Sequence, residues 1–153
     1  MANTYSQVHL HFIFAPKNRQ GLIGSDWEIA LYKYITGIVE ARQHKMIVIN
    51  GMSDLLHMLV GFRTTQSIAD FMQDVKADSS QWINANRFCG SRFEWQSGYG
   101  VFSYSKSQVP DVIHYIQTQK EHHRKVTFQD EYRLFLEKFE VDFDERYVFK
   151  APE

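Results

Sequence analysis

The feature that most constrains this chain is the order in which two hydrophobic periods follow one another. A period of two residues predicts strands, and a period near 3.6 residues predicts amphipathic helices. Strands are expected over residues 5–14, 45–50 and 55–62, and helices over residues 25–43 and 67–87. Residues 93–104 are expected to hold a final strand that is preceded or interrupted by an irregular segment around Gly98 and Gly100. The resulting order of strand, helix, strand, strand, helix and strand is typical of the split βαβ, ferredoxin-like α+β fold. We therefore expect an antiparallel sheet with these two helices on one face.

Short motifs mark where helices are expected to begin. A Ser or Thr followed three residues later by an acidic side chain predicts a helix start, because these side chains pair with backbone N–H groups of the first turn. The chain has three such pairs: Ser25 with Glu28, Ser67 with Asp70, and Thr127 with Asp130. Pro110 suits the first turn of a further helix that is expected to run to Lys125. Two C-terminal helices, over residues 109–125 and 127–139, therefore follow the final strand.

Length and composition favour one soluble domain. The 153 residues are enough for a sizeable core, and 44% hydrophobic with 23% charged residues is not the composition of a disordered chain. There is no repeat or linker, so residues 1–153 are expected to form a single domain, onto which the aromatic and charged tail over residues 142–150 docks. No apolar run approaches the ~20 residues of a membrane span, and no signal-peptide pattern opens the chain. We expect a cytoplasmic protein without membrane association.

The charge balance excludes a global attraction to nucleic acid. Seventeen basic and eighteen acidic residues give a net charge of -1, so any nucleic-acid site must be local. The single cysteine, Cys89, excludes an internal disulfide. The basic side chains that could contact phosphates are Lys17, Arg19, Arg63, Lys120, His122, His123 and Arg124. Each of them is equally compatible with an ordinary solvated surface.

The helix expected after residue 108 combines packing with chemistry. Its apolar stripe consists of Val109, Val112, Ile113 and Ile116, at helical spacing. Tyr115, Gln119 and His122 fall on a second stripe beside it, because residues three and four apart are neighbours on a helix. A phenol, a carboxamide and an imidazole thus share one edge of the helix. The alternative is an ordinary surface helix with a polar edge.

Histidines on two expected strands are further candidates. In the segment over residues 55–62, the period of two places His57 between Leu55 and Leu59 on one face. A lone imidazole between leucines is more often structural than functional. His9 and His11 lie on one face of the first strand, which is adjacent to the third strand in a ferredoxin-like sheet.

Five short motifs together carry a resemblance that spans Tyr5 to Phe149. They are residues 17–19 (KNR), 49–54 (INGMSD), 93–96 (FEWQ), 112–116 (VIHYI) and 119–123 (QKEHH). In this combination the chain resembles the single-tyrosine HUH transposases of the insertion sequence 200/605-like family (transposase A), which belong to the smallest bacterial insertion sequences. Each motif alone is weak, but their combination is specific.

The resemblance implies a detailed set of expectations. These transposases have a ferredoxin-like core and act as homodimers that cut and rejoin single-stranded DNA beside hairpins. Tyr115 matches the tyrosine that attacks the scissile phosphate, forms a 5′-phosphotyrosine and leaves a 3′-hydroxyl. His57 and Gln119 match two ligands of a divalent metal ion, Mg²⁺ or Mn²⁺. The resemblance further implies that the tyrosine helix of one subunit acts in trans, over the metal site of the other.

Physical chemistry is consistent with these roles. A phenol with a pKa near ~10 is a weak nucleophile at neutral pH, so it needs deprotonation or a metal that stabilises charge on the phosphate. A covalent phosphotyrosine keeps the energy of the broken ester, so rejoining requires no nucleotide cofactor. One imidazole with oxygen ligands suits Mn²⁺ better than Mg²⁺.

One position departs from the family pattern. The family has His-hydrophobic-His, whereas this chain has Leu55 in place of the first histidine, and leucine cannot bind a metal. Either His9 or His11 compensates as a ligand, or the chain binds hairpin or single-stranded DNA as a dimer without cutting it. A third, unrelated alternative is a ferredoxin-like oligomer that binds a small ligand.

Overall fold

The computed structural model describes residues 4–18, 22–122 and 127–142. Its four strands are β1 (His9–Phe14), β2 (Lys45–Met52), β3 (Leu55–Gly61) and β4 (Gly100–Tyr104). They form one sheet in the order β2-β3-β1-β4, and every neighbouring pair is antiparallel. The helices are α1 (Glu28–Ala41), α2 (Ile68–Ala85), α3 (Val109–Gln117), α4 (Gln119–His122) and α5 (Phe128–Lys138), and the short 3-10 helix η2 (Lys106–Gln108) precedes α3. This order and pairing confirm the ferredoxin-like prediction.

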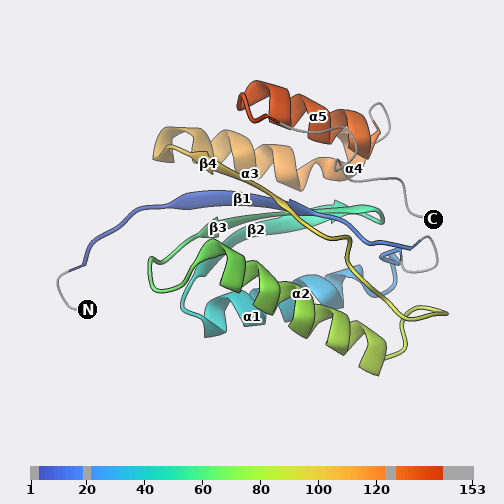
Figure 1. The fold of residues 1–153 in the computed structure, drawn as a ribbon. Coiled ribbons are helices and arrows are strands. Elements are labelled where there is room, and N and C mark those ends of the chain that lie inside the picture. Colours follow the sequence, from blue (N-terminus) through green and yellow to red (C-terminus); the bar gives the residue numbers. More distant parts are fainter. Residues whose placement is uncertain (1–3, 19–21, 123–126, 143–153) are drawn as a thin grey trace.

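Helices cover both faces of the sheet. Figure 1 shows α1 and α2 on one face, and α3, α4 and α5 on the other. The main core lies under α1 and α2, where the Phe12 and Phe71 rings pack with centroids 5.2 Å apart. On the opposite face, Val112 and Ile116 of α3 pack on Leu59 of β3, as the apolar stripe predicts. Within the described residues, no helix has the length and apolar character that a membrane span requires.

Two of the three predicted helix starts are confirmed. Ser67 Oγ accepts a hydrogen bond from Asp70 N at 3.0 Å, and Thr127 Oγ1 accepts one from Asp130 N at 3.3 Å. The prediction for Ser25 is wrong, because α1 begins only at Glu28 and its N-cap makes no side-chain hydrogen bond. There the carbonyl of Gly24 accepts backbone hydrogen bonds from both Trp27 and Glu28, which holds the preceding residues in a turn.

The first strand is shorter than predicted, whereas the last strand follows an irregular segment as expected. β1 begins at His9 rather than at Tyr5. The irregular segment expected before the last strand is confirmed, since β4 begins at Gly100, and the side chain of Asn84 on α2 binds both backbone groups of Phe93. Asn84 Oδ1 accepts from Phe93 N at 2.7 Å, and Asn84 Nδ2 donates to Phe93 O at 3.1 Å. The preceding segment therefore pairs with β1's end only through an isolated bridge between Pro16 and Trp95.

The predicted helix over residues 109–125 is interrupted at Thr118. Two carbonyls of its last turn, those of Ile116 and Gln117, accept hydrogen bonds from Asn50 Nδ2 at 2.9 and 3.2 Å. A continuous helix would satisfy these carbonyls with backbone N–H groups from the next turn. Asn50, on β2, thus ends α3 and fixes its C-terminal end over the sheet. The predicted docking of the tail concerns residues 142–150, of which all but Asp142 lie outside the described residues.

Candidate active site

A carboxylate that the sequence did not single out lies at the centre of the predicted site. Glu131, in the first turn of α5, accepts a hydrogen bond from the Tyr115 hydroxyl through Oε1. The same oxygen accepts from Gln119 Nε2 at 3.2 Å, and it lies 3.2 Å from His57 Nε2. Three residues predicted from α3, α4 and β3 therefore converge on one carboxylate oxygen of α5.

Sheet register explains why His57 has an imidazole partner. His11 of β1 pairs with Leu59 of β3, so His11 and His57 are diagonal neighbours on one face of the sheet. His11 Nε2 lies 2.8 Å from His57 Nδ1, and His11 Nδ1 lies 3.4 Å from the hydroxyl of Tyr104 on β4. A chain of side chains thus runs from β4 through β1 to β3 and ends at Glu131.

The cluster is shielded from water. His11, His57 and Gln119 have no exposed surface, and Glu131 is 5% exposed. Phe135, one turn after Glu131 on α5, packs against His11 and Tyr115 with ring centroids 5.2 and 5.5 Å away. Buried polar atoms normally have hydrogen-bond partners. His57 Nε2 and Gln119 Oε1 depart from that rule, since both are buried without a hydrogen bond, although His57 Nε2 lies 3.2 Å from Glu131 Oε1.

The surroundings hold Tyr115 and His11 in their neutral forms. Burial raises the pKa of the Tyr115 phenol, and the charge of Glu131 and its hydrogen bond raise it further. Burial lowers the pKa of His11 well below its usual value, and the nearby His57 adds to this effect. Burial also raises the pKa of Tyr104 to about 12. Tyr115 in this state is a hydrogen-bond donor, and it must lose its proton to become a nucleophile.

A cavity gives access to the tyrosine. It has a volume of about 380 Å³, and its lining includes Tyr104, Tyr115, Glu131 and Lys138. This volume lies within the usual range of small-molecule sites, about 300–1,000 Å³. The hydroxyl that the sequence indicated as a nucleophile therefore belongs to a hollow between α3 and α5.

His9 and His11, the other predicted metal ligands, have different neighbours from His57 and Gln119. His11 Nε2 is in contact with His57 Nδ1, so His11 adjoins His57 rather than Gln119. His9 and Arg63 line a separate hollow near the N-terminal end of β1. Leu55 is completely buried. Among the described residues, no three His, Cys, Asp or Glu side chains gather as a metal site, so a site here depends on the carboxamide of Gln119.

Of the predicted DNA-contacting residues, the side chains of Lys17, Arg63 and Lys120 are among those that the structure describes, and they have different neighbours. Lys17 pairs with Glu94 at 3.2 Å, and Lys120 pairs with Glu28 at 3.1 Å while also donating to the carbonyl of Gly51. Arg19, His123 and Arg124 lie outside the described residues, as does the side chain of His122.

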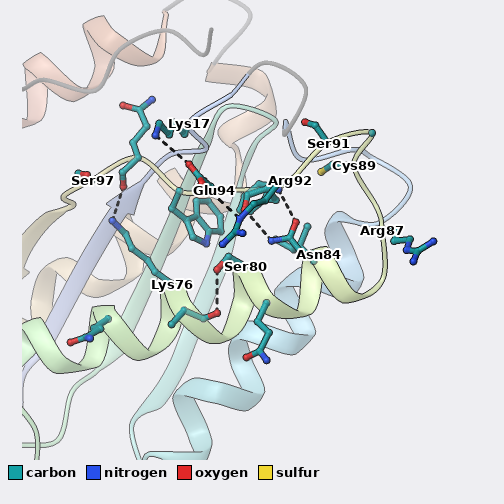
Figure 2. A pocket seen from close by; sticks show the side chains of 18 residues that line it. Lys17, Lys76, Ser80, Asn84, Arg87, Cys89, Ser91, Arg92, Glu94 and Ser97 are labelled. Atoms are coloured by element: carbon teal, nitrogen blue, oxygen red, sulfur yellow. Dashed lines mark hydrogen bonds and ion pairs between the residues drawn. The ribbon is translucent and has the colours of Figure 1, made fainter.

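Lys17 borders a further hollow, which lies between α2 and residues 87–97 and has a volume of about 1100 Å³. Figure 2 shows Lys76, Arg87 and Arg92 around the same hollow, together with Glu94. Polar side chains of α2 supply much of its remaining wall, including Ser80 and Asn84. Basic groups outnumber acidic ones here, which is the balance that phosphate contacts require.

Tyr115 and His57 meet within one chain. Their ring centroids are 5.9 Å apart, and Gln119 reaches the same carboxylate as both. The resemblance implied that the tyrosine helix would serve the site of a partner subunit. In this structure, the components of the site come together without a partner.

The sequence contains a signal for Glu131. In the helix expected over residues 127–139, residue 131 lies three residues after Phe128 and four before Phe135, so it falls on the same apolar stripe at helical spacing. A carboxylate within an apolar stripe is unusual, because a buried charge requires a partner. That position alone would have singled out Glu131.

Comparisons with known proteins agree with this architecture. Residues 4–119 match the model of the family described as "Transposase IS200 like". A crystal structure of a predicted transposase from Deinococcus radiodurans is similar with a TM-score of 0.60 and 20% identity, covering 76% of this chain and 94% of the other. A REP-associated tyrosine transposase bound to a REP hairpin is similar with a TM-score of 0.59 and 14% identity, covering 99% of this chain and 94% of the other. No curated protein sequence matches this chain.

Proposed function

Because the chain belongs to the IS200-like transposase family, we propose that it cuts and rejoins single-stranded DNA through a covalent bond to Tyr115. The observation that carries the proposal is the hydrogen bond from the Tyr115 hydroxyl to the buried carboxylate of Glu131. It gives the phenol a proton acceptor in the hollow that a phosphate group would enter.

In the cutting step, the Tyr115 oxygen bonds to phosphorus and the bond from phosphorus to the 3′ oxygen breaks. Glu131 accepts the phenolic proton, and the leaving 3′ oxygen takes up a proton to become a 3′-hydroxyl. The DNA 3′ of the cut stays attached as a 5′-phosphotyrosine. Rejoining reverses these bonds, when a 3′-hydroxyl attacks the phosphotyrosine and releases Tyr115. The phosphoester count is unchanged, so no nucleotide cofactor is needed.

A divalent ion, Mg²⁺ or Mn²⁺, is part of the proposal. When bound, it would stabilise negative charge on the phosphate. His57 and Gln119 are the residues proposed to hold it, and the chain supports this role because His57 Nε2 and Gln119 Oε1 are buried without hydrogen-bond partners. Both are atoms with lone pairs that suit such ions.

The proposed substrate is single-stranded DNA with a hairpin. Support comes from the similar fold of a tyrosine transposase that was solved with a REP hairpin. Lys17 and the basic hollow beside it offer candidate phosphate contacts on the chain. Homodimerisation remains a prediction of the resemblance, and each subunit of such a dimer would hold its own Tyr115 and His57 together.

A trapping experiment tests the proposal. The full chain is incubated with a 3′-labelled pool of single-stranded oligonucleotides, each with a hairpin flanked by random sequence, in Mg²⁺ or Mn²⁺. Label that migrates with the protein on a denaturing gel is the expected phosphotyrosine adduct. The Tyr115→Phe variant and a chelator are both expected to abolish it, whereas Tyr34→Phe on α1 serves as the matched control and retains it.

Leu55 favours a second function, in which the chain binds such DNA without cutting it. Binding of the pool with no adduct in either metal would overturn the first proposal and leave this one. An adduct that persists in Tyr115→Phe would also overturn the first proposal, since the nucleophile would be another residue. Failure to bind any member of the pool at low salt would exclude both functions.

A further inference from the structure

Leu55 leaves the proposed metal site one side chain short. Leu55 and His57 share one face of β3, because alternate residues of a strand point to the same side. A leucine side chain has no lone pair to offer a cation. The sheet therefore supplies only His57 directly, since His11 is turned to His57 Nδ1.

Glu131 reaches the proposed metal site from a helix, whereas His57 reaches it from the sheet. It lies on α5, which covers this face of the sheet in Figure 1. Its Oε1 lies 3.2 Å from His57 Nε2 and 3.2 Å from Gln119 Nε2. One carboxylate thus touches both residues that the resemblance assigns to the metal.

The two unsatisfied atoms belong to these same partners. His57 Nε2 and Gln119 Oε1 are fully buried and have no hydrogen bond. A carboxamide can exchange its nitrogen and oxygen positions by rotation about its terminal bond. After that rotation, the Gln119 oxygen would face the Glu131 carboxylate. Two oxygen atoms that both accept hydrogen bonds repel one another, so this arrangement requires a cation between them.

His11 prepares His57 for the role of ligand. In the 2.8 Å contact between His11 Nε2 and His57 Nδ1, one nitrogen must donate and the other must accept. When His57 Nδ1 donates, the lone pair of a neutral His57 is on Nε2, which faces Glu131. Hydrogen bonds of this kind to the far nitrogen are the usual support of metal-binding histidines.

From these contacts we propose that Glu131 replaces the missing histidine, so that His57, Gln119 and Glu131 of one chain form a divalent cation site. The proposal rests on the metal dependence in the proposed function. A carboxylate, a carboxamide and one imidazole are ligands that suit Mn²⁺. The second oxygen of the carboxylate allows Glu131 to bind a cation and keep the Tyr115 hydroxyl in reach.

Mn²⁺ binding to the full chain, without DNA, tests this site. Free Mn²⁺ is followed by electron paramagnetic resonance during titration of wild type, Glu131→Gln and the matched control Glu137→Gln, which changes an exposed carboxylate of the same helix. Glu131→Gln keeps the side-chain shape, and we expect it to weaken Mn²⁺ binding at least tenfold. The control is expected to bind as wild type does.

A second pair of variants distinguishes a ligand from a structural residue. Glu131→Asp keeps the carboxylate but withdraws it, so an intermediate affinity is expected. In the double variant Leu55→His with Glu131→Gln, the restored histidine is expected to recover Mn²⁺ binding. Circular dichroism confirms that each variant is folded before it is titrated.

Unchanged Mn²⁺ affinity in folded Glu131→Gln would overturn the proposal, as would equal losses in Glu131→Gln and Glu137→Gln. These results are independent of strand cutting. If the DNA adduct forms but Mn²⁺ affinity is the same in wild type and Glu131→Gln, the proposed function stands and this cation site is excluded. If Mn²⁺ binding depends on Glu131 but no DNA adduct forms, the cation site stands and the proposed strand cutting is excluded.

Discussion

The Tyr115 ring stands edge-on to the His57 ring of the same chain, with 5.9 Å between the ring centroids and 81° between the planes. The register of β3 and the end of α3 jointly fix this relationship. His57 pairs with Asn50 across β2 and β3, and the Asn50 side chain binds the last carbonyls of α3. Tyr115, the proposed nucleophile, is therefore held over the proposed metal ligand His57 by one residue of the neighbouring strand.

This arrangement predicts the outcome of a complementation test. If each chain uses its own Tyr115 and His57, a mixture of Tyr115→Phe and His57→Gln proteins contains no intact site and forms no DNA adduct. If the tyrosine instead acted in trans, mixed dimers would combine the intact Tyr115 of one chain with the intact His57 of the other. The adduct assay on the mixture, after dissociation and reassociation of the two variants, distinguishes these cases. Adduct formation would contradict the arrangement seen within this chain.

The contact between His11 and His57 predicts a role for His11 without direct metal contact. His11→Leu removes the hydrogen-bond partner of His57 Nδ1, so His57 is no longer oriented toward Glu131. We expect Mn²⁺ affinity to fall about tenfold, which is a typical effect of losing such a supporting group. His11→Gln retains a side chain that can accept from His57 and is expected to lose less. Equal affinities of His11→Leu and wild type in the Mn²⁺ titration would show that His57 needs no such support.

Sequence patterns predicted the parts of this site that depend on local spacing. Tyr115 and Gln119 were placed on one edge by helical period alone, and both reach Glu131 even though the helix breaks between them at Thr118. The strand order followed from the succession of hydrophobic periods, because few folds accept that succession.

Several other features depend on contacts between residues that are distant in the sequence. The His11 to His57 contact requires the register of β1 and β3, which no local pattern contains. The break in the long helix depends on Asn50, and the late start of β4 depends on Asn84, both through side-chain hydrogen bonds to distant backbone groups. The metal-binding roles of His57 and Gln119 stay predictions of the resemblance.

Two glycines predict opposite effects on stability. A Cβ added at Gly51, beside the turn between β2 and β3, would lie 2.9 Å from Leu56 Cα and still closer to the carbonyl of Leu55. Backbone atoms cannot move aside independently, so Gly51→Ala is expected to lower the free energy of unfolding by about 1–3 kcal/mol. At Gly37, within α1, a Cβ meets nothing within 4 Å, and Gly37→Ala is expected to raise it by up to about 1 kcal/mol. The urea midpoints of the two variants measure both effects. If both midpoints shift in the same direction relative to wild type, the predicted opposite effects are contradicted.

Burial of Lys76 predicts an unusual pH dependence at the basic hollow. Lys76 donates to the carbonyl of Gln96 at 2.9 Å and to that of Gly98, and burial lowers its pKa to about 8. The amine is then about half neutral at pH 8, whereas an ordinary lysine with a pKa near ~10.4 is almost fully charged there. Since only the neutral amine reacts with acylating reagents, labelling of Lys76 is expected to reach half its maximal rate near pH 8.

Mass spectrometry after brief acylation between pH 6.5 and 10.5 measures this rate, and a free lysine derivative in the same reaction serves as the reference. Above pH 8 the hollow loses the positive charge of Lys76, so a phosphate contact with Lys76 should weaken. Phosphate contacts with Arg87 and Arg92 should persist, because these side chains stay charged. A labelling curve for Lys76 that follows the free derivative would mean that its amine stays charged at neutral and mildly alkaline pH. Its charge would then be available for phosphate contact throughout that range.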